Sequence, residues 1–148
     1  MEISLNRINY FKKLPKHVKL DIIFNMMHES FDEGSHLYKM GDKSQKMYLI
    51  QSGCLEIVID SDKTFTFVIE RLYRGSIINQ NSFLMDDEMD TNAFCKTNLH
   101  VFSITRQKVQ ELRQKYIELD KALDKQERHL LSDMKNEPAI DYIIQDDI

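Results

Sequence analysis

The chain is poor in cysteine, the residue whose disulfide bonds stabilise small extracellular proteins. Of its 148 residues only two are cysteine, Cys54 and Cys95. Two cysteines are too few for a disulfide framework or an all-cysteine metal site, and both lie in apolar stretches. We therefore expect two free, buried thiols in a protein of a reducing compartment.

The chain also lacks a large excess of charge of one sign, and it lacks long apolar runs. The chain has 20 lysines and arginines against 24 aspartates and glutamates, a formal net charge of −4. This balance gives no basic surface for nucleic acid or an anionic membrane. No apolar run approaches the roughly 20 residues of a membrane helix, and residues 1–4 lack the basic-then-apolar form of a signal peptide. We predict an intracellular, cytoplasmic domain with no nucleic-acid partner and no direct membrane insertion.

Only four glycines and two prolines interrupt the chain, and its hydrophobic fraction of 42% suits one domain. In residues 1–30 the apolar residues recur at helical spacing. This spacing predicts N-terminal helices there: a short one near residues 3–10 and a longer one over residues 15–28. Pro15 suits the first turn of the longer helix, where an N–H group has no helical partner.

Residues 31–104 have the composition of short strands. Apolar and polar side chains alternate in several runs, which predicts strands that bury mainly one face. The predicted strands are 47–51, 54–60, 64–71 and 99–104, with core-facing side chains that include Leu55, Ile57, Ile59, Phe65, Phe67 and Ile69. Turn residues at about 8–12-residue intervals indicate a small antiparallel sandwich or barrel.

After residue 104 the apolar spacing becomes helical again. Thr105 is the predicted N-cap of a helical region, 105–136, made of one helix or of two with a bend; Pro138 prevents its continuation into the tail, 137–148. The apolar stripe either packs on the strands or forms a seam with a partner helix; it includes Val109, Leu112, Tyr116, Leu119 and Leu123. The order of helices, strands and helices predicts one α+β domain with segregated elements.

Several motifs of the middle region resemble the cyclic nucleotide-binding domain family. They are Phe31-x-x-Gly34, Met40-Gly41-Asp42, Met47-Tyr48-Leu49-Ile50-Gln51-Ser52-Gly53-Cys54-Leu55-Glu56-Ile57 and Leu72-x-x-Gly75-Ser76. The resemblance covers about residues 8–135. It implies an antiparallel, jelly-roll-like β-roll over residues 31–104, with a short cassette helix near residues 79–85. It also implies flanking N-terminal helices and C-terminal helices of the B and C type.

The segment that binds the ligand in this family departs from the family pattern here. In the family, a Phe-Gly-Glu segment opens the cassette helix, its Glu accepts from the ribose 2′-hydroxyl, and a later Arg pairs with the cyclic phosphate. Asn79 stands in place of the Gly and Gln80 in place of the Glu, and the Arg position falls near Met89. No arginine or lysine occurs between Arg74 and Lys96. The resemblance places a degenerate ligand site at Gly75, Ser76, Ile78, Asn79, Gln80, Asn81, Ser82, Met89, Asp90 and Thr91.

These departures predict lost or weak binding of cAMP or cGMP. A hydrogen bond to a charged group contributes about 1.5–3 kcal/mol, so loss of the Arg and Glu contacts lowers affinity by ~10²–10⁴-fold. We predict a non-enzymatic regulatory or scaffolding module with protein partners, inside a larger protein or assembly. A channel at the cytoplasmic face of a membrane, a kinase, or a ciliary or cytoskeletal complex are such settings. The alternative is a genuine cAMP or cGMP sensor that uses non-standard contacts.

The chain carries no recognisable catalytic or metal-binding motif. Its five histidines have no i,i+4 or cysteine partner, and the acidic run 86–90 lacks the order of a calcium loop. We therefore expect neither an enzyme nor a metal site, and no cofactor beyond weakly held cyclic nucleotide. In ether-à-go-go-type channels a tail segment fills the pocket. Similarity to that device implies an intrinsic ligand at Tyr142, Ile143 and Ile144; a frayed or partner-bound tail is the other interpretation.

Overall fold

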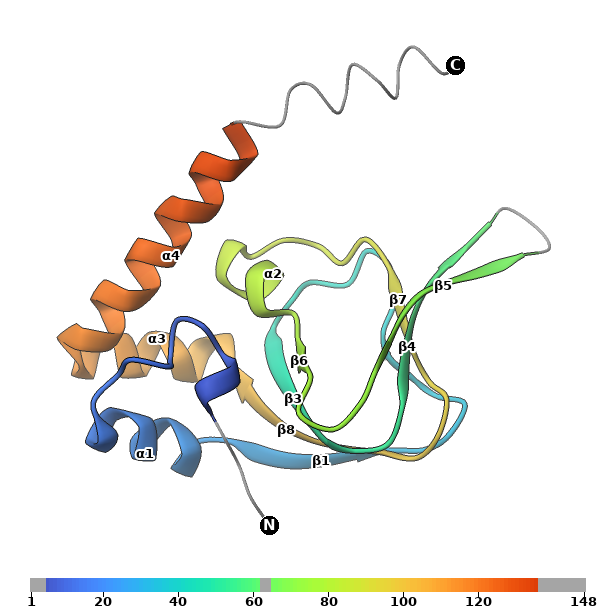
Figure 1. The fold of residues 1–148 in the computed structure, drawn as a ribbon, viewed down its shortest axis with the longest axis horizontal. Coiled ribbons are helices and arrows are strands. Elements are labelled where there is room, and N and C mark those ends of the chain that lie inside the picture. Colours follow the sequence, from blue (N-terminus) through green and yellow to red (C-terminus); the bar gives the residue numbers. More distant parts are fainter. Residues whose placement is uncertain (1–4, 62–64, 136–148) are drawn as a thin grey trace.

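The computed structural model describes residues 5–61 and 65–135 (Figure 1). A short 3-10 helix, η1 (Leu5–Arg7), and helix α1 (Lys16–Phe24) precede the β region, and helices α3 (Arg106–Lys115) and α4 (Ile117–Lys135) follow it. One further helix, α2 (Gln80–Met85), lies within the β region. Helices α1, α3 and α4 gather at one end of the strands, as the α+β prediction requires.

Two antiparallel sheets form the β-roll, each with four strands in the part of the chain that is described. The first has the order β1 (Met27–Phe31), β8 (Leu99–Thr105), β3 (Lys46–Ser52) and β6 (Ile77–Ile78). The second has the order β2 (His36–Tyr38), β7 (Asn92–Cys95), β4 (Leu55–Asp60) and β5 (Thr66–Leu72). The predicted antiparallel β-roll is confirmed, and the four predicted strands correspond to β3, β4, β5 and β8.

The apolar side chains form two cores. One fills the inside of the roll, where Leu55, Ala93 and Leu99 are completely buried. The other lies between the helices and the first sheet. The C-terminal stripe belongs to this second core, together with Val18 and Ile22 of α1; its buried members are Val109, Leu112, Leu119 and Leu123. These four side chains of the stripe therefore pack within the chain, which is the first of the two interpretations.

The C-terminal region is two helices joined by a bend. Thr105 is the predicted N-cap of α3, and its Oγ1 accepts a hydrogen bond from the backbone N–H of Lys108 at 3.1 Å. Tyr116 ends α3 with extended dihedral angles of −122° and 112°. Helix α4 then begins at Ile117. The bend arises because one residue leaves the helical region of φ/ψ space, so α4 can leave the axis of α3.

The N-terminal region differs from the prediction of helices over residues 1–30. The short helix is a 3-10 turn, and the longer one ends at Phe24 rather than at residue 28. The Asn25 side-chain amide donates to the backbone carbonyl of Asp21 at 2.7 Å, which occupies an acceptor at the helix C-terminus. Residues Met27–Phe31 are strand β1, since they pair along their whole length with β8. Pairing partners 68 to 76 residues away override the local helical spacing.

Strand β5 does not bury the face that its alternation predicts. Phe65, Phe67 and Ile69 are exposed, at 67%, 58% and 54% of their surface. Strand β5 is at the edge of its sheet and pairs only with β4, and the β4–β5 hairpin projects from the body in Figure 1. No other described element covers it, so alternation alone does not produce burial there.

The two cysteines are both free thiols. Cys95 is buried in the roll, and burial raises the pKa of its thiol. Cys54 is only partly buried, so the prediction of a buried thiol is correct for Cys95 alone. Among the helices of the described residues, none has both the length and the apolar composition that a bilayer-spanning helix requires.

Candidate functional site

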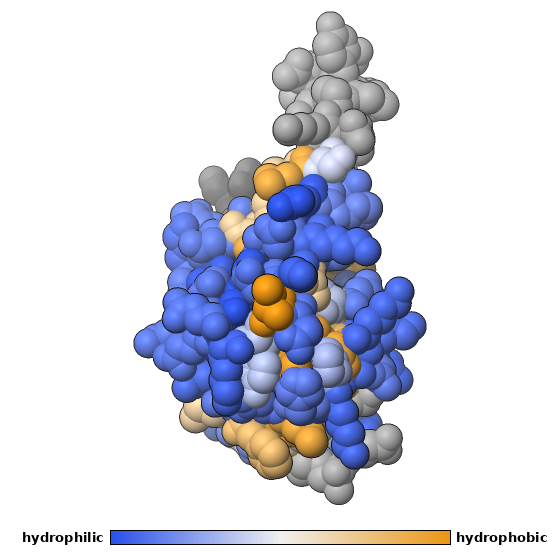
Figure 2. All heavy atoms as spheres, turned by 90° about the vertical axis from the view of Figure 1, so that its left-hand side faces the viewer, coloured by the Kyte–Doolittle hydropathy of each residue, from blue (hydrophilic) through white to orange (hydrophobic). Residues whose placement is uncertain are grey.

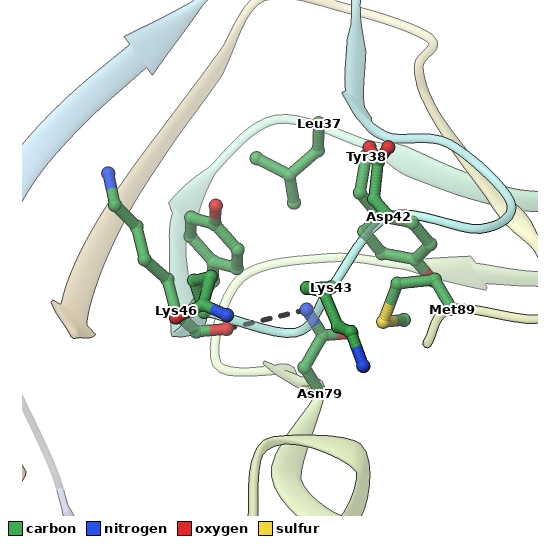
Figure 3. A pocket seen from close by; sticks show the side chains of 9 residues that line it. Leu37, Tyr38, Asp42, Lys43, Lys46, Asn79 and Met89 are labelled. Atoms are coloured by element: carbon green, nitrogen blue, oxygen red, sulfur yellow. Dashed lines mark hydrogen bonds between the residues drawn. The ribbon is translucent and has the colours of Figure 1, made fainter. Parts of the chain in front are cut away.

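A pocket of about 370 Å³ opens in the β-roll beside the start of α2 (Figure 3). Its walls come from β2, the β2–β3 loop, β3 and the residues that flank α2 on both sides. Its volume is within the range of small-molecule sites. The side chains that line it are Leu37, Tyr38, Asp42, Lys43, Gln45, Lys46, Tyr48, Asn79 and Met89. Of the ten residues that the resemblance assigned to a ligand site, two therefore line this pocket.

Asn79, the first of these two, has a left-handed backbone conformation with φ 70° and ψ 24°. Asparagine tolerates this conformation better than most residues, because its short polar side chain can bond locally. Its amide Nδ2 donates to the backbone carbonyl of Lys46 at 3.4 Å, the dashed line in Figure 3. Asn79 thus keeps the backbone shape that glycine would supply and adds a side chain that occupies part of the pocket wall.

Gln80, which the resemblance assigned to the family's Glu position, faces away from the pocket. Its side-chain Oε1 accepts a hydrogen bond from the backbone N–H of Asn9 at 3.1 Å. Its backbone carbonyl accepts another from the Tyr10 hydroxyl at 3.0 Å. Both contacts tie α2 to the N-terminal segment. The Gln80 amide oxygen is therefore occupied by this chain and is not one of the groups that line the pocket.

Met89, the second residue that lines the pocket, is 6% exposed. The backbone holds it in place from both sides: its N–H donates to the Asp42 carbonyl at 2.8 Å, and its carbonyl accepts from Gly41 N–H at 2.7 Å. Its thioether is uncharged and a weak acceptor. At this place in the wall the pocket therefore offers no cation to a phosphate.

The first residues of the assigned segment have structural contacts. Gly75 lies against the side chain of Arg7, so closely that an added Cβ would be 3.0 Å from the guanidinium carbon. The Ser76 hydroxyl accepts from the backbone N–H of Tyr73 at 3.3 Å. Ile78 is buried in the core of the roll. All three shape the turn and the strand that lead into α2, and none lines the pocket.

The remaining assigned residues lie on either side of the pocket. Asn81 and Ser82 line a separate hollow of about 320 Å³ between α2 and the end of α4. Asp90 is exposed to solvent. The Thr91 hydroxyl is 3.1 Å from the hydroxyl of Tyr38, so these two side chains hydrogen-bond each other. The structure therefore divides the assigned segment between the pocket, the second hollow and the core.

The cations of the pocket are two lysines that the sequence analysis did not assign. The Lys46 ammonium lies 2.9 Å and 3.1 Å from the two carboxylate oxygens of Glu29 and is neutralised by them. Lys43 has no ion pair within residues 5–61 and 65–135. Alternate residues of a strand share a face, so Lys46 and Tyr48 of β3 lie on the same side. This spacing could have assigned both residues to the pocket from the sequence. Lys43 gave no such signal, since it lies in a loop.

No arginine is among the described residues that line the pocket. Arg71 precedes the assigned segment by four residues. Its guanidinium pairs with the buried carboxylate of Glu56 at 2.8 Å. Neither Arg74 nor Lys96 is one of the lining residues. The basic side chains that flank the assigned segment in the sequence therefore do not supply the missing guanidinium.

The two phenols that line the pocket and the Glu29 carboxylate that pairs with Lys46 have shifted pKa values. Burial, with the nearby Glu29 charge, raises the pKa of Tyr48 to about 12, and burial likewise raises the pKa of Tyr38. Both phenols are neutral at physiological pH. Burial acts to raise the pKa of Glu29, but hydrogen bonds from Ser103 and Lys46 outweigh it and hold that pKa below its usual range. The carboxylate behind the pocket is therefore ionised.

The acidic run 86–90 is held by backbone pairing with the β2–β3 loop. Asp87 accepts from the Ser44 N–H at 3.2 Å, and Glu88 forms an isolated β-bridge with Lys43. The Asp86 carboxylate lies 3.4 Å from the Arg106 guanidinium. The part of the chain that is described has no group of three or more potential metal ligands. The predicted intrinsic ligand, Tyr142 to Ile144, lies outside the described residues and stays a prediction.

Comparison with known proteins agrees with this geometry. The sequence profile of the cyclic nucleotide-binding domain matches residues 28–116. Cyclic nucleotide-gated channel alpha-4 of Mus musculus is 22% identical over 134 residues, which are 88% of this chain and 23% of the channel subunit. The chain thus spans about a quarter of the length of that relative.

Solved structures share the fold at low identity. The N-terminal domain of a transcriptional regulator from Streptomyces coelicolor superposes with a TM-score of 0.77 and 14% identity, over 90% of this chain and 94% of that domain. The regulatory subunit of a cAMP-independent protein kinase A from Trypanosoma brucei superposes with a TM-score of 0.64 and 17% identity. That match covers 96% of this chain and 48% of the subunit.

Proposed function

The chain belongs to the cyclic nucleotide-binding domain family, and from this premise we propose that it is a non-enzymatic regulatory or scaffolding module with lost or weak cAMP and cGMP binding. In this proposal it acts through protein partners within a larger protein or assembly. The cytoplasmic face of a channel, a kinase complex, and a ciliary or cytoskeletal complex are the settings that we propose.

One observation carries the proposal of lost or weak binding. The residue in the family's Glu position, Gln80, has its side-chain acceptor bonded to Asn9 and turned away from the pocket. A ribose hydroxyl in the pocket would have no acceptor from this residue. Met89 supplies no charge to a phosphate, and Glu29 neutralises Lys46. These observations support the proposal that both contacts that anchor the ligand in the family pattern are lost here.

The size of this loss decides whether a ligand at cellular concentration would occupy the pocket. Hydrogen bonds to charged groups contribute about 1.5–3 kcal/mol each. Two missing contacts weaken binding by ~10²–10⁴-fold. A site that loses this much affinity is mostly empty wherever an intact site of the family is half filled.

A solved structure with the same fold supports the idea that such a module can serve a protein that is independent of cAMP. The regulatory subunit from Trypanosoma brucei belongs to a kinase described as cAMP-independent. The β-roll can therefore be kept in a regulatory protein whose activity does not depend on cAMP. For this chain we propose the same separation of the fold from the ligand.

The exposed apolar strand supports the proposal of protein partners. Phe65, Phe67 and Ile69 of the β4–β5 hairpin lie in solvent at more than half of their surface. The edge of β5 pairs with no described strand. Exposed apolar patches and free strand edges are typical of protein interaction sites. In this proposal the hairpin is the surface that contacts a partner.

A second function, a genuine sensor of cAMP or cGMP, is favoured by one residue only. Lys43 lines the pocket and has no ion pair among the described residues. An ammonium can replace a guanidinium as a phosphate partner, although without its two-pronged geometry. A sensor of this kind would use Lys43 where the family pattern has the arginine.

A thermal shift experiment separates the two functions. Ligand that binds only the folded state raises the melting temperature, by an amount that grows with concentration over the dissociation constant. We expect micromolar cAMP or cGMP to leave the melting temperature unchanged. A rise of several degrees that disappears in Lys43→Ala, but not in the matched control Lys39→Ala, would establish the sensor instead. Lys39 lies in the same loop and does not line the pocket.

A further inference from the structure

A hollow lined by basic side chains shares no lining residue with the pocket beside α2. A groove of about 640 Å³ lies between the N-terminal segment and the middle of α4. Its floor includes the ring of Tyr10 and the small side chain of Ala122. Basic and amide side chains form its sides; they include Lys13, Lys125, Gln126 and Arg128.

The charge of this groove is not balanced by its own walls. Lys13 and Lys125 are exposed and have no ion pair in residues 5–61 and 65–135. Arg128 pairs with Asp124 at 2.8 Å, one turn earlier on α4. Exposed pairs of this kind hold little free energy. No described carboxylate lines the groove. A chain with carboxylates and apolar side chains would complement both the sides and the floor.

The C-terminal segment, residues 136–148, has that composition. It carries four carboxylates, Glu137, Asp141, Asp146 and Asp147, and neither lysine nor arginine. Its apolar residues are interspersed with these acids without a clear period and are Ile140, Tyr142, Ile143, Ile144 and Ile148. The segment begins directly after α4, whose middle forms one side of the groove. It is therefore tethered beside the groove at a high local concentration.

The segment is long enough to reach every part of the groove. Along a helix the chain rises 1.5 Å per residue, so Ala122 lies about 20 Å from the end of α4. Thirteen extended residues span up to about 43 Å. A turn near Pro138 would bring the chain back along α4. The tether thus leaves more than enough length for the acids to meet Lys125 and Lys13.

We propose that the acidic segment 136–148 binds in cis to this basic groove, with its carboxylates against Lys13 and Lys125. Screening by salt would weaken the contact, because both lysines are exposed. The groove also adjoins the cassette helix: Asn9 lines it, and Asn9 donates to Gln80 at the start of α2. A segment bound in the groove therefore contacts the same part of the chain that holds Gln80 away from the pocket.

Hydrogen–deuterium exchange of the full chain tests the proposal. We expect the amides of residues 139–148 to exchange more slowly at low salt than at high salt. We also expect the double variant Lys13→Glu with Lys125→Glu to exchange them about tenfold faster than the unaltered chain at low salt. The matched control is Lys12→Glu with Lys121→Glu, which changes the net charge equally at exposed lysines that do not line the groove. This control should keep the slow exchange.

Three outcomes would overturn the proposal. In one, the segment is unprotected in the unaltered chain. In another, the groove variant keeps the protection, which would mean that the segment binds elsewhere, including the cyclic nucleotide pocket. In the third, the groove and control variants lose protection equally, which would mean that net charge alone is responsible. Circular dichroism melting of each variant, with unchanged midpoints expected at these exposed positions, shows that the fold is intact.

Discussion

The side-chain oxygen of Gln80 accepts a hydrogen bond from the backbone N–H of Asn9, 71 positions earlier in the chain, at 3.1 Å. The Tyr10 hydroxyl adds a second bond to the Gln80 carbonyl. The first turn of α2 is thus fastened to the N-terminal segment. The residue that the resemblance assigned to the family's Glu position is, in this structure, a contact between two parts of the same domain.

The Gln80 contact gives a first prediction about stability. Gln80→Ala should lower the free energy of unfolding by about 1 kcal/mol, because Asn9 loses its acceptor. Gln80→Glu should stay within about 0.5 kcal/mol of the unaltered chain, since a carboxylate oxygen also accepts. Urea unfolding at equilibrium measures both. Asn81→Ala is the control, as Asn81 is exposed next to Gln80; an equal loss there would contradict the importance of the contact.

The backbone of Asn79 gives a second prediction. Its φ of 70° is costly for residues with a Cβ, by roughly 1–2 kcal/mol, and least so for asparagine and glycine. Asn79→Ala should therefore destabilise the chain by about 1 kcal/mol. Asn79→Gly should be close to neutral. Chemical denaturation of the two variants side by side tests this order, and a more stable Ala variant would show that the conformation is not imposed by the fold.

Two phenylalanines with opposite surroundings give a third prediction. Phe83 of α2 is 2% exposed, and the Arg106 guanidinium lies 5.0 Å from the centre of its ring. Phe83→Ala should cost about 3–5 kcal/mol through lost burial and a cavity. Phe67→Ala should cost less than about 0.5 kcal/mol, because its ring is exposed. It should instead weaken capture of a protein partner or of an apolar dye. A large loss of stability for Phe67→Ala would mean that the hairpin is part of the core.

The lowered pKa of Glu29 gives a fourth prediction, about acid. A carboxyl whose pKa is lower in the folded chain than in the unfolded one stabilises the fold above its unfolded value, here about 4.5. That stabilisation is lost as the pH falls through the lowered, folded-state value. The urea concentration at the unfolding midpoint should therefore decrease as the pH is lowered below about 4.5. Glu29→Gln should make this decrease smaller. Glu33→Gln, at an exposed position, should leave it unchanged; equal flattening would exclude Glu29 as the cause.

The sequence predicts helix caps and turns, because these features depend on the residues that form them. Thr105 begins α3 because a hydroxyl can cap the first free N–H groups. The turn at Gly53 favours glycine because its φ is 98°, a conformation that glycine adopts without a side-chain clash. Such features are determined within a few residues, so a sequence alone is sufficient to find them.

Features that depend on distant partners were not predicted. Strand β1 forms because it pairs with β8. The helical spacing of the apolar residues up to Met26 did not indicate a strand after it. Phe67 alternates like a core residue, yet β5 has no layer to cover it. In the pocket, Asn79 and Met89 were found through the motif. Lys43 and Tyr38 were missed, because a loop and a three-residue strand have no periodicity to read.

Isothermal titration calorimetry with cAMP and cGMP tests the central claim most directly. The unaltered chain should give no binding heat at micromolar concentrations, because neither Gln80 nor Met89 offers the ligand a charge. The variant Asn79→Gly, Gln80→Glu and Met89→Arg restores the residue types of the family pattern and should bind more tightly. The gain comes from Met89→Arg, which lines the pocket and adds one charged hydrogen bond of about 1.5–3 kcal/mol, or ~10–10²-fold in affinity. Micromolar binding by the unaltered chain, with no gain in the variant, would contradict the account.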